Sequence, residues 1–579
     1  MAGNVIVPAF SLILVVGVAL GVVAVVHFNN KDDDPRITGN VKAVQSICEH
    51  AEDQKLCHET LVPSKGSQDP KEYYKTAVET TINSVIKSLN MTNKLSVEHG
   101  NKDKGIKMAL DDCKEMLDLA IDSLEASAKL VRENDIQAIY NNTADFTNWL
   151  SATISYHQTC MDSFDTDGEK KVREQLQSNG LNDMGKLTGM TLDIVSDLSK
   201  ILESFHLKLN VKPASTDSRR RLLSVNVDSQ GFPTWFSAAD RKLMAQLQKK
   251  GGHHLRITPN VVVAQDGSGT HKSIADAIAA VPKNSNNRFV IYVKAGVYKE
   301  YVTVPKDATR VLMYGDGPTR TIITGNKNYA AGTKTMETAT FSVIGQWFIA
   351  KSMRFENTAG WAGHQAVALR VSSDMSAFFD CGIHGYQDTL YVHANRQFYR
   401  NCEISGTIDF IFGHSRTIIQ NSKIIVRKPG PSQFNTVTAD GTERTKENTG
   451  IVIQNCEILP EKELYPERFQ VKSYLGRPWK ASSTTVVMES TIGDFVQPDG
   501  WTPWDGNIYL DTLYYAEYNN RGPGAALDRR VKWKGYRGAI SKDEAARFIP
   551  GAFLEAGPSG KLYWLKATGI PYQIGFIAS

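Results

Sequence analysis

The chain has 579 residues, 41% of them hydrophobic and 22% charged, so its composition is that of a globular protein and its length excludes one ordinary core. Residues 224–579 carry 41 Lys+Arg and 31 Asp+Glu, a net charge of +10, whereas residues 1–223 carry 25 and 31, a net charge of −6. The basic part of the chain therefore favours an anionic partner.

A long apolar run opens the chain. Residues 5–28 contain no Asp, Glu, Lys or Arg, and Lys31-Asp32-Asp33-Asp34 follows, so the run is long enough to cross a bilayer. We expect residues 1–30 to direct the chain into the secretory pathway. Length and the lack of a small-residue cleavage site favour an uncleaved membrane anchor, while the missing basic flank leaves a cleaved signal open. For a secreted chain with dispersed basic residues, an acidic extracellular polysaccharide is a better partner than nucleic acid.

Residues 41–209 are predicted to form an α-helical four-helix bundle, because apolar residues recur at three- and four-residue spacing, for example over residues 108–124. An even number of cysteines in this part of a secreted chain fits two disulfide bridges. The four are Cys48, Cys57, Cys113 and Cys160.

Two further features of the N-terminal part concern processing. Asn90 and Asn141 each begin an Asn-x-Thr triplet and are predicted glycosylation sites. Residues 210–223 are polar and contain the basic cluster Arg219-Arg220-Arg221, at the point where helical periodicity stops and strand periodicity starts. This position favours an exposed linker that a protease can reach over a solvated turn.

Residues 258–579 consist of short runs of Val, Ile, Phe and Tyr separated by Gly, Asn and Asp, which predicts an all-β domain. Five of the runs align so that Asn or Asp recurs at one position, with steps of 23, 21, 20 and 34 residues: Asn357, Asp380, Asn401, Asn421 and Asn455. Repeats of this length without interleaved helices indicate a β-helix rather than a leucine-rich horseshoe.

Stacked coils place residues one repeat apart on neighbouring strands, about 4.7–4.9 Å from each other. Cys381 and Cys402 share a register on adjacent coils, so we expect a disulfide between them and a free Cys456. The alternative is that Cys381 and Cys402 are buried thiols in a core ladder. The sequence contains no CxxC or HExxH, so we expect no metal site and no metal cofactor.

Three polar residues lie eight positions beyond the aligned Asn or Asp, namely Gln365, Asp388 and Asp409. They should stack on three successive coils. Two carboxylates about 5 Å apart cannot both ionise readily, so one is expected to be an anion and the other an acid, as a nucleophile and a general acid require. Arg477 is a candidate cation for the anionic member. Taken singly, each residue is more simply a turn or ladder residue, and the matched register favours a site.

Four segments together resemble the plant pectin methylesterase family. They read GYQDTLY at 385–391, DFIFG at 409–413, LGRPW at 475–479 and QAVALR at 365–370. The resemblance covers about 258–579 and implies a right-handed parallel β-helix that hydrolyses pectin methyl esters in the cell wall without a cofactor. Residues 41–209 resemble the inhibitor-like pro-region of such precursors, which implies bridges Cys48–Cys57 and Cys113–Cys160. Arg220-Arg221-Leu222-Leu223 is similar to a processing site for a subtilisin-like protease.

The resemblance also implies a role for each site residue. Asp409 resembles the nucleophile and Asp388 the acid that protonates methanol and later activates water. Gln387 and Gln365 resemble the amide donors for the oxyanion, and Arg477 would keep Asp409 ionised. The implied substrate contacts are Gln365, Thr335, Tyr391, Arg477 and Trp479. Separate pectin methylesterase inhibitor proteins are a further implied partner.

Two positions depart from the family pattern. His414-Ser415-Arg416 follows DFIFG where an Asn and small apolar residues are usual, and we expect His414 to lie on the surface. Met336 stands where an aromatic residue is more usual, which puts one substrate contact in doubt.

Competing functions remain. A serine esterase lacks support because no Gly-x-Ser-x-Gly occurs. A β-helix glycosidase acting on polygalacturonate could use the same carboxylates, and a noncatalytic polysaccharide-binding protein would need only the basic and aromatic residues. For the pro-region, the opposite charges of the two parts favour autoinhibition over a folding aid or a retention signal.

Overall fold

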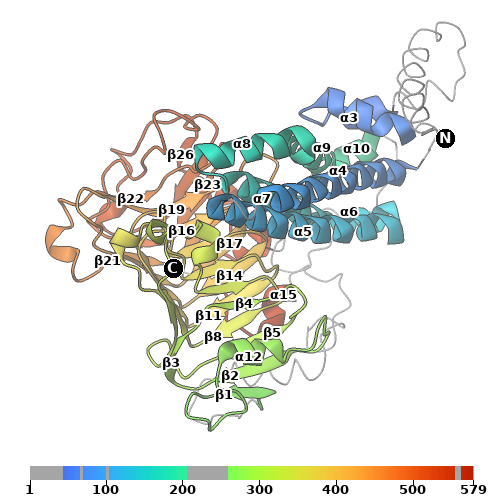
Figure 1. The fold of residues 1–579 in the computed structure, drawn as a ribbon. Helices are drawn as coiled ribbons and strands as arrows, with labels where there is room; N and C mark the ends of the chain where they lie inside the picture. Colours follow the sequence, from blue (N-terminus) through green and yellow to red (C-terminus); the bar gives the residue numbers. More distant parts are fainter. Residues whose placement is uncertain (1–42, 65–68, 100–102, 205–257, 555–562, 578–579) are drawn as a thin grey trace, which may run out of the picture.

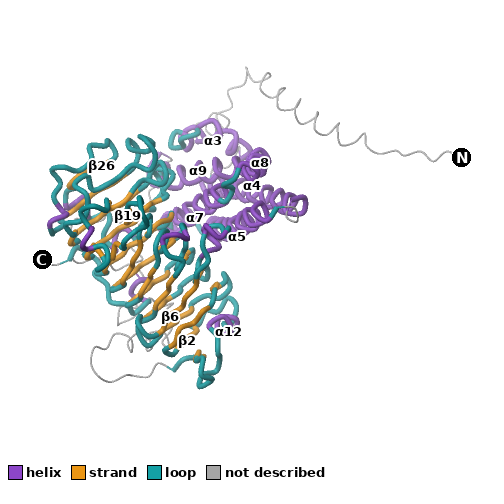
Figure 2. Tube along the Cα trace, turned by 60° about the vertical axis from the view of Figure 1, so that its left-hand side comes forward, coloured by secondary structure: helices purple, strands orange, loops and turns teal. Residues whose placement is uncertain are grey.

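The computed structural model describes residues 43–64, 69–99, 103–204, 258–554 and 563–577. In Figure 1 a bundle of helices, coloured blue to teal, lies against a stack of short strands coloured green to red. Figure 2 shows the same two bodies from a second direction, with the helices along one flank of the strand stack. The apolar run at 5–28, the basic cluster at 219–221 and the processing motif at 220–223 lie outside the described residues.

The predicted four-helix bundle is confirmed. α4 (Pro70–His99) and α7 (Thr143–Asp162) each pack against both α5 (Lys104–Glu133) and α9 (Asn182–Ser196), and their apolar faces form one buried core. Shorter helical segments complete this part: α3 (Gln54–Leu61), η1 (Val62–Ser64), α6 (Ile136–Asn141), α8 (Asp167–Leu176), η2 (Gln177–Leu181) and α10 (Leu198–Ser204).

Side-chain caps fix where these helices begin. The Asp103 carboxylate accepts the backbone N–H of Ile106 at the start of α5. At α8, Thr166 and Glu169 form a capping box in which each side chain accepts a backbone N–H of the other residue. The caps satisfy N–H groups that the first helical turn would leave unpaired.

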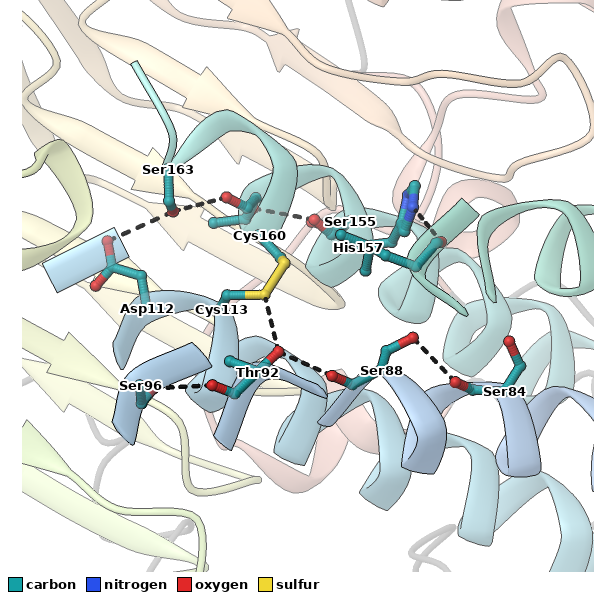
Figure 3. The surroundings of a disulfide bond; sticks show 12 residues. Ser84, Ser88, Thr92, Ser96, Asp112, Cys113, Ser155, His157, Cys160 and Ser163 are labelled. Carbon is teal, nitrogen blue, oxygen red and sulfur yellow. Dashed lines mark hydrogen bonds between the residues drawn. A yellow bond between two sulfur atoms is a disulfide. The ribbon is translucent and has the colours of Figure 1, made fainter. Parts of the chain in front are cut away.

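Both disulfides implied for the bundle are present, Cys48–Cys57 and Cys113–Cys160. Figure 3 shows the second bridge joining α5 to α7, with Thr92 of α4 beside it. Asp112 precedes Cys113 and Thr159 precedes Cys160, so the bridge ties together two helical segments that reach the strand stack.

The predicted β-helix is also confirmed, because every strand pairing among the described residues is parallel and the strands form three long sheets. The first sheet contains β1 (Val261–Val263), β2 (Phe289–Val293), β5 (Val311–Tyr314), β8 (Ile349–Lys351), β11 (Ser376–Phe379), β14 (Arg396–Arg400), β17 (Arg416–Gln420), β20 (Gly450–Gln454), β23 (Thr484–Met488), β25 (Tyr514–Tyr518) and β26 (Tyr536–Ala539). The second contains β4 (Val302–Val304), β7 (Phe341–Val343), β10 (Leu369–Val371), β13 (Leu390–Val392), β16 (Ile411–Gly413), β19 (Asn435–Asp440) and β22 (Ser473–Gly476). The third contains β3 (Gly296–Lys299), β6 (Thr321–Gly325), β9 (Arg354–Asn357), β12 (Gly382–His384), β15 (Glu403–Gly406), β18 (Lys423–Val426), β21 (Glu457–Pro460) and β24 (Thr491–Ile492).

Short helices cover parts of this stack. α12 (Ile274–Ala279) packs on β1 and β4, and the outer face of the first sheet packs against residues of α13 (Lys542–Ala545), α14 (Pro550–Phe553) and α15 (Tyr563–Ala567). The remaining 3₁₀ turns are η3 (Tyr329–Ala331), η4 (Thr335–Thr338), η5 (Trp361–Gly363), η6 (Tyr465–Glu467) and η7 (Pro523–Ala525).

The repeat alignment is right at four of its five positions. Asp380, Asn401, Asn421 and Asn455 each turn the chain from the first to the third sheet with φ of 51–54°. Asn and Asp tolerate this left-handed conformation better than other side chains, which explains the ladder. The assignment of Asn357 was wrong: Ser352 (φ 52°) occupies the equivalent corner, and Asn357 ends β9 with its amide bonded to backbone carbonyls.

The predicted bridge between Cys381 and Cys402 is also wrong, because both are free, buried thiols, as is Cys456. Their position in the coil is a ladder of small polar side chains that also contains Ser422 and Ser490, whose hydroxyls accept backbone N–H groups of the preceding coil. Each of the three thiols donates to a backbone carbonyl instead of joining a neighbour. Burial raises the pKa of the Cys381 thiol.

The bundle and the solenoid meet through ion pairs of one polarity. In each pair between the two bodies in the described part of the chain, the cation belongs to the solenoid and the carboxylate to the bundle. The pairs are Lys306–Asp122, Lys334–Asp165, Lys334–Glu169, Arg370–Glu115, Arg396–Asp145, Arg444–Glu52, Arg444–Asp193, Lys446–Asp197 and Lys480–Asp162. The opposite net charges of the two sequence halves are thus matched at the contact.

Candidate active site

Asp388 and Asp409 lie on adjacent coils at the entrances to β13 and β16. Leu390 pairs with Ile411 in the parallel register, and the backbone N–H of Asp388 donates to Ile408 O, so the two aspartates are neighbours across one strand spacing. Both adopt positive φ, 61° for Asp388 and 48° for Asp409, and both are buried. The predicted stacking of these two residues is therefore present in the structure.

Arg477, just beyond β22, grips Asp409 with two hydrogen bonds. Its Nε donates to Asp409 Oδ1 at 2.8 Å and its Nη2 donates to Oδ2. The Thr436 hydroxyl donates to the same Oδ1 at 2.7 Å. A bidentate guanidinium and a hydroxyl donor both stabilise the ionised carboxylate, so this geometry favours Asp409 as the anion.

The environment of Asp388 favours the neutral acid. Burial raises the pKa of Asp388 well above its usual value and the nearby Asp409 charge raises it further, while Arg477 opposes both effects. Within the described residues, Asp409 is thus paired with an arginine and Asp388 is not. This asymmetry is what divides the roles of nucleophile and acid in a carboxylate pair.

The two aspartates open into a cavity of about 380 Å³ at the outer face of the second sheet. All other residues expected in the site on sequence grounds line the same cavity: Gln365, Gln387, Thr335, Tyr391, Arg477 and Trp479. Gln365 lines the cavity although its position was predicted from Asn357, which is not a corner residue. The backbone N–H of Ala366 donates to Gln387 O, so Gln365 and Gln387 lie on adjacent coils.

Aromatic residues form the floor of the cavity. Tyr391 stacks on Phe412 of the next coil with ring centroids 4.3 Å apart, and Trp479 lies against Phe412 and Trp504. The guanidinium of Arg477 lies 4.3 Å from the Trp504 ring centroid. Trp504 was not expected from the sequence, because it belongs to a loop without a matching position in the repeat.

The bundle supplies one wall of the cavity. Asp112, Thr159, Asp162, Ser163 and Asp165 line it together with the catalytic candidates. The Thr159 hydroxyl on α7 lies 3.3 Å from the Tyr391 hydroxyl and 2.9 Å from His393 Nε2. Tyr391 is only 4% exposed, so the ring that could stack on a sugar is covered by α7.

Lys334 is a buried interface cation that pairs with two carboxylates of the bundle. Its Nζ donates to Glu169 Oε2 at 2.8 Å and to Asp165 Oδ2 at 3.1 Å, and it lies immediately before Thr335 at the cavity wall. Met336, flagged as unusual in the sequence, is buried and belongs to the apolar core of the bundle. Its apolar side chain therefore contacts the bundle in this structure.

The expectation for His414 was wrong. His414 is 4% exposed and its Nε2 bonds to a carboxylate oxygen of Glu447, which also accepts the backbone N–H groups of Glu443 and Arg444. Burial lowers the pKa of His414, but the charge of Glu447 and its hydrogen bond raise it by more, so the net pKa lies above the usual value. The residue is a buried support for the 443–447 turn.

The two sequons lie on helices of the bundle. Asn90 is exposed near the C-terminal end of α4, while Thr92 of its triplet is buried and its hydroxyl donates to Ser88 O. Asn141 ends α6 and is partly exposed. Glycosylation at both sites stays a prediction.

None of the helices that the structure describes has the length and apolarity required to span a bilayer.

Comparison with known proteins agrees with both parts. Residues 260–557 match the family model described as pectinesterase, and residues 42–194 match that of the plant invertase/pectin methylesterase inhibitor. Pectinesterase 4 of Arabidopsis thaliana is 40% identical, covering 99% of this chain and 100% of the relative. The probable pectinesterase/pectinesterase inhibitor 21 of the same plant is 39% identical over 99% of this chain and 82% of the relative. The solved pectin methylesterase from carrot is 50% identical, with a TM-score of 0.54, over 56% of this chain and 100% of that structure.

The fold and the site together define a β-helix carboxylic-ester hydrolase with a docked inhibitor-like helical domain. The site joins a carboxylate held by an arginine to a second carboxyl group whose pKa is raised, beside two amide side chains. The chain belongs to the pectinesterase family.

Proposed function

We propose that this protein hydrolyses the methyl esters of pectin, releasing methanol and leaving free galacturonate carboxylates in the cell wall. The observation that carries the proposal is the pairing of Asp409 with Arg477 next to an Asp388 whose pKa is raised. The two carboxyl groups then start the reaction in the two different protonation states that ester cleavage requires.

The catalytic cycle uses these groups in two steps. An Asp409 oxygen attacks the ester carbonyl carbon. Gln365 and Gln387, which line the cavity, donate to the oxyanion that forms. Collapse breaks the bond to the methoxy oxygen, which takes the Asp388 proton and leaves as methanol. Asp388, now ionised, removes a proton from water as the water attacks the acyl carbon. The acid product leaves, Asp409 is an anion again and Asp388 is again protonated.

Methanol assay of the fragment 224–579 tests this assignment. We expect Asp409→Asn to lower turnover by several orders of magnitude and Asp388→Asn by about 10²–10⁴-fold, since the first removes the nucleophile and the second the acid. Asn keeps the size of Asp and its tolerance of positive φ. Unchanged methanol release in Asp409→Asn would support a noncatalytic binding protein, and shortening of the polymer chain would support a glycosidase.

We infer that the helical bundle holds the enzyme inactive until it is removed. Support comes from α7, which covers Tyr391, and from the bundle residues that line the catalytic cavity, where a bound polymer chain would need space. Equal turnover by the uncleaved chain and by the fragment 224–579 would contradict autoinhibition. Addition of residues 41–209 as a separate protein to the fragment provides the control, and we expect it to restore inhibition.

The precursor's remaining organisation is part of the proposal. We assign residues 1–30 to a secretory segment that anchors the precursor in a membrane, 41–209 to the inhibitor-like bundle, 210–223 to the linker and 258–579 to the catalytic domain. A subtilisin-like protease would cut after Arg220-Arg221-Leu222-Leu223, and separate inhibitor proteins of the bundle's type could then occupy the vacated face. N-terminal sequencing of the secreted enzyme tests the cleavage point: a start at Ser224 supports it, and a start inside 258–579 contradicts it.

A further inference from the structure

A second cavity, of about 460 Å³, lies at the corner between the second and first sheets. It shares no lining residue with the catalytic cavity. Its walls come from β17, from the 442–449 loop, from the starts of β23 and β25, and from α14, and its rim residues Thr445, Thr512, Arg537 and Arg547 are exposed. The cavity is therefore open to solvent with the bundle in place.

The most buried cation of this cavity is Arg416, which is 3% exposed. Its Nε and Nη1 are buried and have no hydrogen-bond partner among the described residues. An arginine cannot shed its charge in the way that a buried carboxyl group can, so a buried guanidinium without acceptors is costly. Such a group needs an anion.

The neighbouring carboxylates are already engaged. Arg396 pairs with Arg416 in register on the next strand. Arg396 donates to Asp374 from Nε at 3.0 Å and from Nη2 at 2.7 Å, and it donates to Asp145 of the bundle from Nη1 at 2.7 Å. Burial and the charge of Arg396 lower the pKa of Arg416 to about 9, in spite of Asp374 and Asp145. Arg416 thus lacks an acceptor for its Nε and Nη1 among the described residues because the nearby carboxylates, Asp374 and Asp145, are bound to Arg396.

The rest of the wall has the chemistry of a sugar site. Arg537 and Arg547 add two exposed cations, while Arg444 is already paired with Glu52 and Asp193 of the bundle. The one lining carboxylate, Glu447, is engaged by His414 and by two backbone N–H groups. The Phe553 ring lies 5.4 Å from the Arg416 guanidinium carbon, and Tyr514 and Phe548 are further aromatic walls. Hydroxyl groups complete the lining: Thr442, Thr445, Thr449, Ser482, Thr484 and Thr512.

We propose that this cavity is an accessory site for a de-esterified uronate residue, whose carboxylate binds Arg416 and whose ring packs against the aromatic wall. A guanidinium fork matches a carboxylate bidentately, whereas a methyl ester presents no charge to it. The identity of the ligand rests on the proposed function, because that reaction makes uronate carboxylates along the polymer. The site would hold the product region of the polymer on the enzyme while another region is in the catalytic cavity.

Thermal shift and calorimetric titration of the full chain test the site, with de-esterified trigalacturonate, its fully methyl-esterified form and sulfate as probes. We expect the de-esterified trimer to raise the Tm, and we expect Arg416→Gln to weaken its binding by about tenfold or more, as loss of a charged hydrogen bond does. The double variant Arg537→Ser, Arg547→Ser changes only the exposed rim and should weaken binding without a folding defect. Arg529→Gln, an exposed arginine outside the cavity, is the matched control and should bind as the wild type does.

Equal binding by wild type, Arg416→Gln and the rim variant would overturn the proposal, since the trimer would then bind elsewhere. A response to sulfate or to the esterified trimer equal to that of the de-esterified trimer would overturn the assignment to a uronate. Binding is measured on the full chain and turnover on the fragment 224–579, so binding of the trimer here together with no methanol release by the fragment would contradict the proposed function and leave the accessory site standing.

Discussion

The Lys334–Glu169 contact offers a direct way to loosen the bundle without cutting the chain. The side chains of Lys334 and Glu169 are 9% and 4% exposed, and the Lys334 ammonium donates to Glu169 Oε2 at 2.8 Å. Glu169→Gln removes the charge of the acid but keeps an oxygen for the backbone N–H groups of Asp165 and Thr166, so the start of α8 is preserved.

The size of the effect follows from burial. Removing one partner of a buried ion pair costs about 3–5 kcal/mol. Asp165 lies 3.1 Å from Lys334 and is 38% exposed, so it remains as a second carboxylate for the ammonium. The cost of Glu169→Gln is therefore at the low end of this range, about 3 kcal/mol. Since each 1.4 kcal/mol is about tenfold in an equilibrium constant, the open fraction of the uncleaved chain should rise by about 100-fold.

Methanol release by the uncleaved chain measures that open fraction. We expect Glu169→Gln to raise it by about 100-fold, limited by the turnover of the fragment 224–579. Asp167→Asn is the matched control on the same helix: its ion pair with Lys170 is exposed and contributes about 0–1 kcal/mol, so activity should change less than about fivefold. If the Glu169→Gln chain folds normally and its turnover equals that of Asp167→Asn, the bundle does not restrain the enzyme through this contact.

Three further outcomes are expected. Because the pKa of Asp388 is raised in the folded state, the folded protein keeps a proton that the unfolded chain loses near pH 4. The stability that this proton contributes is lost as the pH rises. Asp388→Asn should therefore raise the Tm more at pH 7 than at pH 3.5, and an equal shift of the Tm at both pH values would refute the raised pKa. Cys381, Cys402 and Cys456 should react with iodoacetamide only after denaturation, and a Cys381–Cys402 peptide in disulfide mapping would contradict the free thiols. Arg427 donates to Gly385 O at 2.9 Å and to the Tyr386 hydroxyl at 3.0 Å, so it positions the turn that carries Asp388. Arg427→Met should therefore lower kcat about tenfold and shift the alkaline limb of the pH profile. Arg468→Met, at a partly exposed ion pair with Asp494, should do neither.

The periodic part of the molecule could be predicted because a solenoid converts sequence spacing into distance. The offset of eight from Asp380 and Asn401 led to Asp388 and Asp409, and both pairs keep their register in the structure. Asn357 failed because an Asn at the end of a strand resembles an Asn at a corner when only residue types are compared. The true corner residue, Ser352, carries no such signal.

The features that sequence reasoning missed arise where distant segments meet. Trp504 contacts Arg477 from a loop, and Thr436, in the long 34-residue repeat between Asn421 and Asn455, donates to Asp409. No repeat offset therefore points to either residue. His414 was expected at the surface because exposed His is common, and its partner Glu447 lies 33 residues away, where no repeat offset points to it. Arg416 belongs to the same departure from the family pattern, and the sequence could not show that its Nε and Nη1 find no acceptor among the described residues.

The left-handed backbone at Asp388 and Asp409 limits which replacements these positions can accept. Asn and Gly enter this region of φ readily, whereas a longer or branched side chain adds a conformational cost to any chemical one. Glu at either position would combine a displaced carboxylate with a strained turn, so a descendant of this enzyme could exchange its nucleophile only by rebuilding the corner of the coil as well. The scaffold itself thereby conserves the two acids.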